Sequence, residues 1–276
     1  RECCPRQFVT HNFMGLFPVL DYYDLARDLD FVSWDNYPVW GEPAIRYETA
    51  LSADLMRGLK GRNFWIMEQT AGPCGSSDFG RNPHPGEIRS IAHQAVAHGA
   101  AGMVWFRWRT CTVGREQYWH GLLGHDGKLG RRYHEASRTA AELQKVSRAV
   151  GDAKVAADAA ILYDYESLWA LEIQPGIPKD NYTERVRCYH RALFRAGVGL
   201  DLIPPSADFG KYKLLLAPAL HVLPDELAER LLAYVRAGGV LFTDYRTGVK
   251  DEYNRCHART LPGKLATALG VVIEEY

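Results

Sequence analysis

The chemistry that this sequence could perform begins with a carboxylate at the end of an apolar run. Glu68 directly follows Phe64-Trp65-Ile66-Met67, and Gln69 stands beside it. An ionisable group is thereby placed where a buried strand leaves the core. A carboxylate in this position can act as a nucleophile, an acid or a base. A solvated loop residue is the simpler interpretation when Glu68 is considered alone.

Four apolar runs, at residues 8–13, 31–34, 64–67 and 103–108, are predicted to form buried strands. Polar or aromatic residues lie at the end of each run: His11 and Asn12; Trp34, Asp35 and Tyr37; Glu68 and Gln69; Trp105, Arg107, Trp108 and Arg109. An enzyme built on a parallel barrel gathers its chemistry at the C-terminal ends of successive strands. Four strands that end in this way favour a barrel over an open sheet.

Helical patterns separate these strands. The clearest covers residues 88–96, with Pro85 before it and Gly99 after it, and another carries Ala136, Ala140, Leu143 and Val146 on one face. Alternating strands and helices predict a parallel sheet, either doubly wound or closed into a barrel. Only four strands precede a change of pattern near residue 150, whereas a barrel needs eight. We therefore expect half of a TIM (β/α)8 barrel.

A second α/β pattern follows. Strands are predicted at residues 159–163, 200–203, 214–217 and 240–244, and helices at 183–196 and 225–237, the latter with Leu227, Leu231, Leu232 and Val235 facing inward. The pattern predicts a smaller doubly wound domain resembling flavodoxin. Residues 163–167 replace the Gly-rich loop that would bind a phosphate, which favours contacts between subunits over a nucleotide. The predicted domains are residues 1–152 and 153–276.

The overall composition narrows the class of partner. Lys plus Arg and Asp plus Glu both total 33, so no net charge attracts nucleic acid or an anionic membrane. No long apolar run or secretory signal is apparent, and a cytoplasmic location is expected. The six cysteines are scattered, and His84, His93 and His98 lack the spacing of metal ligands. Neither a metal nor another cofactor is expected.

Several longer motifs together carry a family resemblance. They are Thr10-His11-Asn12-Phe13-Met14-Gly15, Ser33-Trp34-Asp35-Asn36-Tyr37-Pro38, Met67-Glu68-Gln69-Thr70-Ala71-Gly72-Pro73, Trp105-Phe106-Arg107-Trp108-Arg109, Gly124-His125-Asp126-Gly127 and Ala160-Ile161-Leu162-Tyr163-Asp164-Tyr165-Glu166-Ser167. The sequence closely resembles the β-galactosidases of glycoside hydrolase family 42 over essentially its whole length.

This resemblance implies a fold and an activity. Residues 1–152 would form strands five to eight of the catalytic barrel, with Glu68 as the nucleophile at the end of strand seven. Residues 153–276 would form the family's trimerisation domain, giving a homotrimer in the complete protein. The implied substrate is a β-galactoside or galacto-oligosaccharide, hydrolysed with retention. The family's acid/base Glu would lie before Arg1, so these residues alone should be inactive. The alternative is a non-catalytic carbohydrate-binding or subunit-assembly module.

The resemblance and the strand ends also suggest residues that bind the substrate. They are Asn12, Asp35, Tyr37, Trp105, Glu116 and His120. Asp35 is interpreted as a structural or sugar-contacting residue rather than the acid/base. Glu116 and His120 are four residues apart, whereas some relatives use three, so the alignment of His120 is the less secure. Trp105 and Trp108 alternate and cannot face the same way, and aromatic residues in strands are more often core.

Overall fold

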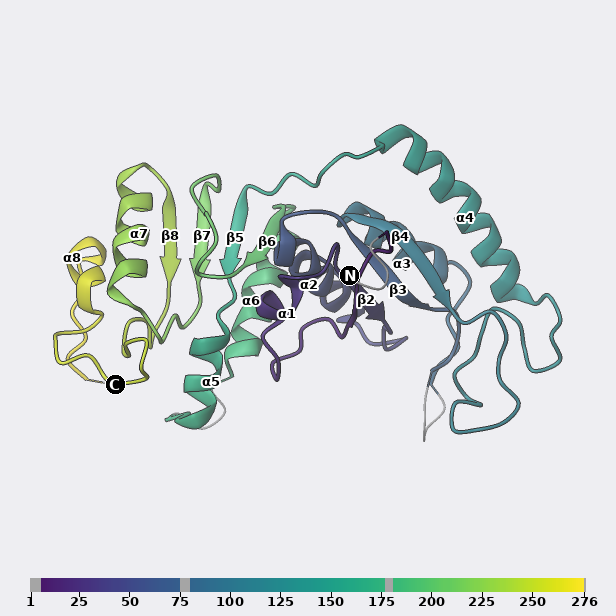
Figure 1. The fold of residues 1–276 in the computed structure, drawn as a ribbon, viewed down its shortest axis with the longest axis horizontal. Helices are drawn as coiled ribbons and strands as arrows, with labels where there is room; N and C mark the ends of the chain where they lie inside the picture. The colour runs from purple at the N-terminus through teal and green to yellow at the C-terminus, as the bar shows by residue number, and fades with distance from the viewer. Residues whose placement is uncertain (1–5, 75–79, 177–180, 276) are drawn as a thin grey trace. The chain divides into compact units, whose positions relative to one another are not determined.

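The computed structural model describes residues 6–74, 80–176 and 181–275 (Figure 1). The chain divides into two compact units by its internal contacts. The first comprises Arg1–Phe17 and Tyr22–Val155, and the second comprises Pro18–Asp21 and Ala156–Tyr276. Each unit contains its own parallel sheet.

The sheet of the first unit has the strand order β1-β2-β3-β4. Its strands are β1 (Asn12–Phe13), β2 (Ser33–Asn36), β3 (Phe64–Thr70) and β4 (Ala100–Phe106), and all neighbours are parallel. Its helices are α1 (Tyr22–Ala26), α2 (Ile45–Lys60), α3 (Glu87–Ala97) and α4 (Arg131–Val150). Each strand lies beside the next one along the chain, with a helical segment between them. This sequential order is typical of one arc of a barrel.

The first strand is shorter than predicted. The apolar run at residues 8–13 contributes only Asn12–Phe13 to the ladder, and Phe8 is 60% exposed. Val9 instead exchanges hydrogen bonds with Asp30, whose backbone amide donates to the Val9 carbonyl and whose side chain accepts from the Val9 amide. The strands predicted from residues 31, 64 and 103 are confirmed as β2, β3 and β4, although their ends differ by a few residues.

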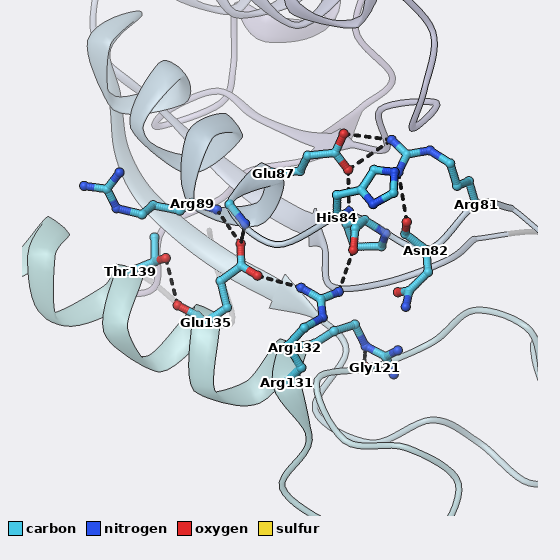
Figure 2. A network of polar contacts seen from close by, with 12 residues as sticks. Arg81, Asn82, His84, Glu87, Arg89, Gly121, Arg131, Arg132, Glu135 and Thr139 are labelled. Carbon is cyan, nitrogen blue, oxygen red and sulfur yellow. Dashed lines mark hydrogen bonds and ion pairs between the residues drawn. The ribbon is translucent and has the colours of Figure 1, made fainter.

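Helix α3 begins and ends as its sequence predicts. Gly86 has a φ of 94° before the first turn, and Gly99 has a φ of 102° after the last. Figure 2 shows how Glu135 of α4 completes the start of α3: its Oε1 accepts from the backbone amides of Gly86 and Arg89, and its Oε2 accepts from Arg131. Glu135 is 6% exposed. A buried carboxylate therefore satisfies amides that the helix itself leaves unbonded and fastens α3 to α4.

Strand β3 contains an irregularity next to Glu68. Ile66 pairs with Trp34 of β2, but the next residue of β2, Asp35, pairs with Glu68, so Met67 is skipped. The register against β4 also shifts between Ile66 and Gln69. Strict alternation would place Glu68 on the side of the fully buried Ile66. The extra residue brings Glu68 into register with Asp35.

The second unit has the strand order β6-β5-β7-β8. Its strands are β5 (Ala159–Leu162), β6 (Leu200–Ile203), β7 (Leu214–Ala217) and β8 (Val240–Thr243), and its helices are α5 (Tyr165–Ile173), α6 (Tyr182–Arg195), α7 (Asp225–Arg236), the 3₁₀ helix η1 (Gly263–Leu265) and α8 (Ala266–Leu269). Strand β6 lies on one side of β5, and strands β7 and β8 follow on the other side. This order confirms the predicted doubly wound sheet.

One side of this sheet packs on helix α7. Leu162 and Leu215 share a buried cluster with Leu227 and Leu231 of the helix. The prediction that Val235 faces inward is wrong, because Val235 is 38% exposed.

Tyr234 takes the inward position instead. A Cβ on Gly239 would lie 2.2 Å from the Tyr234 ring, so the space for this ring exists only because residue 239 has no side chain. Helical spacing alone does not distinguish residue 234 from residue 235.

The sequence did not predict helix α5. Its apolar residues Leu168, Trp169, Ala170 and Leu171 surround the helix rather than forming one stripe, so the usual helical period is absent. Asp164 caps the helix by accepting from the Ser167 amide. The segment after β5 that replaces a phosphate loop therefore starts a helix capped by its own carboxylate.

Candidate active site

Two neutral donors hold the carboxylate of Glu68. Asn12 Nδ2 donates to Oε1 over 3.3 Å, and the Tyr37 hydroxyl donates to Oε2 over 2.5 Å. Asn12 belongs to β1, Tyr37 follows β2, and Glu68 lies in β3. Three neighbouring strands thus bring these side chains together at one edge of the sheet, as their parallel order requires.

A second carboxylate lies beside the first. Asn12 Nδ2 also donates to Asp35 Oδ1 over 3.0 Å, so one amide nitrogen bridges Asp35 and Glu68. Burial and the nearby charge of Glu68 raise the pKa of Asp35 to about 6, and the hydrogen bond from Asn12 opposes this rise. Two carboxylates at one site disfavour simultaneous ionisation.

Tyr37 is kept in its protonated form. Burial raises the pKa of its hydroxyl, and the hydrogen bond to Glu68 and the negative charge there raise it further. The hydroxyl therefore remains a donor. Behind the site, Asn36 Nδ2 donates to Gln69 Oε1 over 3.0 Å. Both amides are buried, and their bond ties the ends of β2 and β3 together.

A pocket of about 870 Å³ opens over these groups. It is lined by Met14, Trp34, Asp35, Asn36, Tyr37, Pro38, Val39, Glu42, Ala44, Ile45, Glu48, Thr49, Ser52, Glu68, Phe106, Arg107, Glu116 and Trp119. Carboxylates and aromatic rings dominate the lining around Glu68. Such a surface can hydrogen-bond the hydroxyls of a sugar and pack against its C–H groups.

The loop after β4 supplies a charged pair to this pocket. Glu116 Oε2 accepts from Arg107 Nη2 over 2.5 Å, and both residues line the pocket. Arg107 also stacks over the Phe106 ring at 4.8 Å. The guanidinium thereby orients the carboxylate that the sequence suggests for binding sugar hydroxyls.

His120 is not among the residues that line this pocket, and its role in binding substrate stays a prediction. Its ring contacts that of His125 at 5.3 Å, and its backbone amide donates to Pro73. Burial, then the charges of Arg132 and His125, lower the pKa of His120. These contacts place the His120 ring beside His125.

Trp105 likewise is not among the residues that line the pocket, and its role in binding substrate stays a prediction. It packs against the buried cluster of Ala71, Ile88, Leu122 and Ala136, which brings together β3, the loop before α4, and helices α3 and α4. Phe106, the next residue, lines the pocket instead. Alternation along a strand explains the exchange, since successive side chains point to opposite faces.

Sequence reasoning did not select Arg107 or Trp119 as site residues. Arg107 ends the fourth apolar run with charge, which was a signal that could have been used. Trp119 is one aromatic residue in a loop, and only the folded loop shows that it meets Tyr37 with a centroid distance of 4.7 Å.

A metal centre and a membrane-spanning helix are two further features that a chain of this length could contain. Within residues 6–74, 80–176 and 181–275, no group of three or more His, Cys, Asp or Glu side chains could hold a metal ion. Over the same part of the chain, no helix has the length and apolar character needed to cross a membrane.

Comparison with known proteins agrees with this geometry. The family model described as beta-galactosidase of glycoside hydrolase family 42 matches residues 1–146, and the model of the beta-galactosidase trimerisation domain matches residues 157–276. The chain therefore belongs to the β-galactosidases of glycoside hydrolase family 42.

Relatives match the chain over its full length. Beta-galactosidase BgaA from Clostridium cellulovorans is 40% identical over 282 residues, covering 100% of this chain and 42% of the relative. The crystal structure of beta-galactosidase from Bacillus circulans sp. alkalophilus has a TM-score of 0.92 at 35% identity, covering 98% of this chain and 40% of that one. The enzyme from the Antarctic haloarchaeon Halorubrum lacusprofundi has a TM-score of 0.91 at 38% identity, covering 98% and 42%. The chain thus spans about two fifths of these relatives.

Proposed function

We propose that the full-length protein hydrolyses terminal β-D-galactosides with retention of configuration, and that Glu68 is its nucleophile. The observation that carries this proposal is the Glu68 carboxylate, oriented by Asn12 and Tyr37 at the strand ends and facing a pocket. Attack of its oxygen on the anomeric carbon would form a galactosyl ester and release the aglycone. Water would then cleave the ester.

Each hydrogen bond to Glu68 has a role in this reaction. Both carboxylate oxygens are engaged, so the side chain is held in one orientation before the substrate arrives. The donors are neutral, so they do not cancel the negative charge that attacks. As the ester forms, negative charge leaves the carboxylate while positive charge develops at the anomeric carbon, so the hydrogen bond from Tyr37 to Glu68 weakens.

The acid/base is a different group from Asp35. A retaining glycosidase places its two carboxyl groups roughly 5 to 5.5 Å apart on either side of the bond that breaks. Asp35 and Glu68 instead accept hydrogen bonds from the same Asn12 nitrogen, so they lie side by side. We assign Asp35 to the support of Asn12 and Glu68. The acid/base is then expected from outside residues 1–276, in the part of the family's length that this chain does not span.

Trapping of the intermediate tests the proposal. The full-length protein is treated with a 2-deoxy-2-fluoro-β-galactoside bearing an activated leaving group, digested, and analysed by mass spectrometry. We expect one galactosyl label, on the peptide containing Glu68, and loss of turnover in Glu68→Ala. Glu142→Gln, at an exposed position on α4, is the matched control and should be labelled normally. A label on another residue, or full turnover in Glu68→Ala, contradicts the assignment.

We also propose that residues 153–276 assemble the full-length protein into a homotrimer, with residues 1–152 belonging to the catalytic barrel as strands five to eight. The match of residues 157–276 to the trimerisation domain supports this assembly, and the sequential order β1-β2-β3-β4 supports the barrel. Sedimentation equilibrium of the full-length protein should give three times the monomer mass. A monomer at micromolar concentration would contradict the assembly.

A further inference from the structure

Three aromatic rings form one wall of the pocket. Tyr37, Phe106 and Trp119, called here the aromatic wall, all line it. Their ring centroids lie 4.7 Å apart for Tyr37 and Trp119, 6.1 Å for Tyr37 and Phe106, and 6.4 Å for Phe106 and Trp119, with interplanar angles of 80° to 87°. These are favourable edge-to-face arrangements, so the three rings support one another.

The aromatic wall starts at the nucleophile. Tyr37 donates its hydroxyl to Glu68, and Trp119 contacts the Tyr37 ring. A pyranose whose anomeric carbon reaches Glu68 must therefore lie near this wall. The hydroxyl of Tyr37 is already bonded to the Glu68 carboxylate. Of the other two rings in the aromatic wall, Trp119 is the larger.

Trp119 and Glu116 belong to one turn. The backbone amide of Trp119 donates to the Glu116 carbonyl over 3.1 Å, and the Glu116 side chain is held by Arg107. The turn thus presents a carboxylate for hydroxyl groups and an indole for C–H groups. A β-galactosyl ring needs both, because its axial 4-hydroxyl leaves the C–H bonds of carbons 3, 4 and 5 together on one face.

We propose that Trp119 is the ring on which the galactosyl group stacks during attack by Glu68, and so determines affinity for the sugar. This inference rests on the proposed function, because Glu68 fixes where the anomeric carbon lies. The indole contacts the apolar face of the sugar while Glu116 accepts from its hydroxyls. The contact is made with the galactosyl group itself and is therefore independent of the aglycone.

Substitutions in the full-length protein test this role. Trp119→Ala should raise the dissociation constant for free galactose about tenfold by isothermal titration calorimetry, and should raise KM for an aryl β-galactoside by a similar factor. Tenfold corresponds to about 1.4 kcal/mol. Trp119→Phe keeps an aromatic face and should restore galactose affinity to within about threefold of the wild type. Circular dichroism establishes that each variant is folded.

Trp108→Ala is the matched control. Trp108 lies close in sequence, is 56% exposed and packs on Tyr133 rather than lining the pocket, so galactose affinity should be unchanged. Unaltered galactose affinity in Trp119→Ala overturns the proposal. A lower kcat with unaltered affinity does so too, because the indole would then only support Tyr37. The fluoro-sugar label on Glu68 is read separately in every variant, so failure of the nucleophile assignment is distinguished from failure of the stacking assignment.

Discussion

The Tyr37 hydroxyl donates to Oε2 of Glu68 over 2.5 Å, joining the end of β2 to a carboxylate in β3. Hydrogen bonds to charged groups contribute about 1.5 to 3 kcal/mol. Tyr37→Phe removes this bond while keeping the ring in the aromatic wall. We expect kcat/KM for an aryl β-galactoside to fall between about tenfold and a hundredfold. Tyr253→Phe, at a position 70% exposed in the second unit, should retain wild-type rates. A kcat/KM for Tyr37→Phe equal to that of the wild type would show that the hydrogen bond from Tyr37 does not orient Glu68.

Asp35 should make stability depend on pH. Its pKa is raised from 3.8 to about 6 in the folded protein, so the folded state holds this proton more tightly than the unfolded state. The resulting stabilisation is present at low pH and is lost as the pH rises from 3.8 through about 6. Asp35→Asn removes the titrating group. The variant should therefore melt at a higher temperature than the wild type near pH 7.5, and the difference should shrink toward pH 4.

Thermal melts at several pH values check this expectation. The control is Asp28→Asn at an exposed position, which should give the same difference from the wild type at every pH. A melting difference for Asp35→Asn that does not vary with pH would mean that the charge of Glu68 and burial do not act on Asp35 in the folded protein.

Glu135 and Glu142 allow a buried and an exposed carboxylate of one helix to be compared. Glu135→Ala leaves the amides of Gly86 and Arg89 without this acceptor and removes one acceptor of Arg131, which still donates to the Pro83 carbonyl. Breaking a buried, charge-assisted network of this kind costs about 3 kcal/mol of unfolding free energy. Glu142→Ala removes only surface contacts, with Arg89 and His93, worth about 0.5 kcal/mol. Urea denaturation measures both. Similar losses in the two variants would contradict the anchoring role of Glu135.

Gly239→Ala tests the packing of α7. The added methyl group would fall 2.2 Å from the Tyr234 ring, which is itself only 6% exposed. Overpacking of this kind costs about 1 to 3 kcal/mol. Gly130→Ala is the control, because no atom lies within 4 Å of the place that its methyl group would occupy. Denaturation midpoints that are equal in the two variants would show that the Tyr234 ring moves away at no cost.

Much of the site could be predicted from the sequence because parallel strands impose a simple rule. Polar residues at the ends of neighbouring strands must meet at one edge, and Asn12, Asp35, Tyr37 and Glu68 do so. Most of the order of strands and helices was equally accessible, since apolar runs and helical periods are local properties. Helix α5 is the exception, because its apolar residues lack the helical period.

The remaining features depend on contacts that no local pattern reveals. Trp119 meets Tyr37 through the path of a loop, and the same path places the ring of its neighbour His120 against His125. Trp105 packs on a core cluster and Phe106 lines the pocket because strand register decides which side chain points to which face. Tyr234 replaces Val235 in the core because Gly239 leaves room for a ring.

The skipped pairing of Met67 has a consequence for engineering and for natural variation. Deleting this single residue would leave every group of the site present in the sequence, yet it would return β3 to a regular ladder. Glu68 would then follow Ile66 directly and would still pair with Asp35. With Met67 present, a regular pairing of Met67 with Asp35 would instead turn Glu68 to the face of Ile66, away from Asn12 and Tyr37. The unpaired Met67 is therefore what lets a strand of this length present Glu68 to the site, and the pairing of β3 with β2 matters as much as the carboxylate.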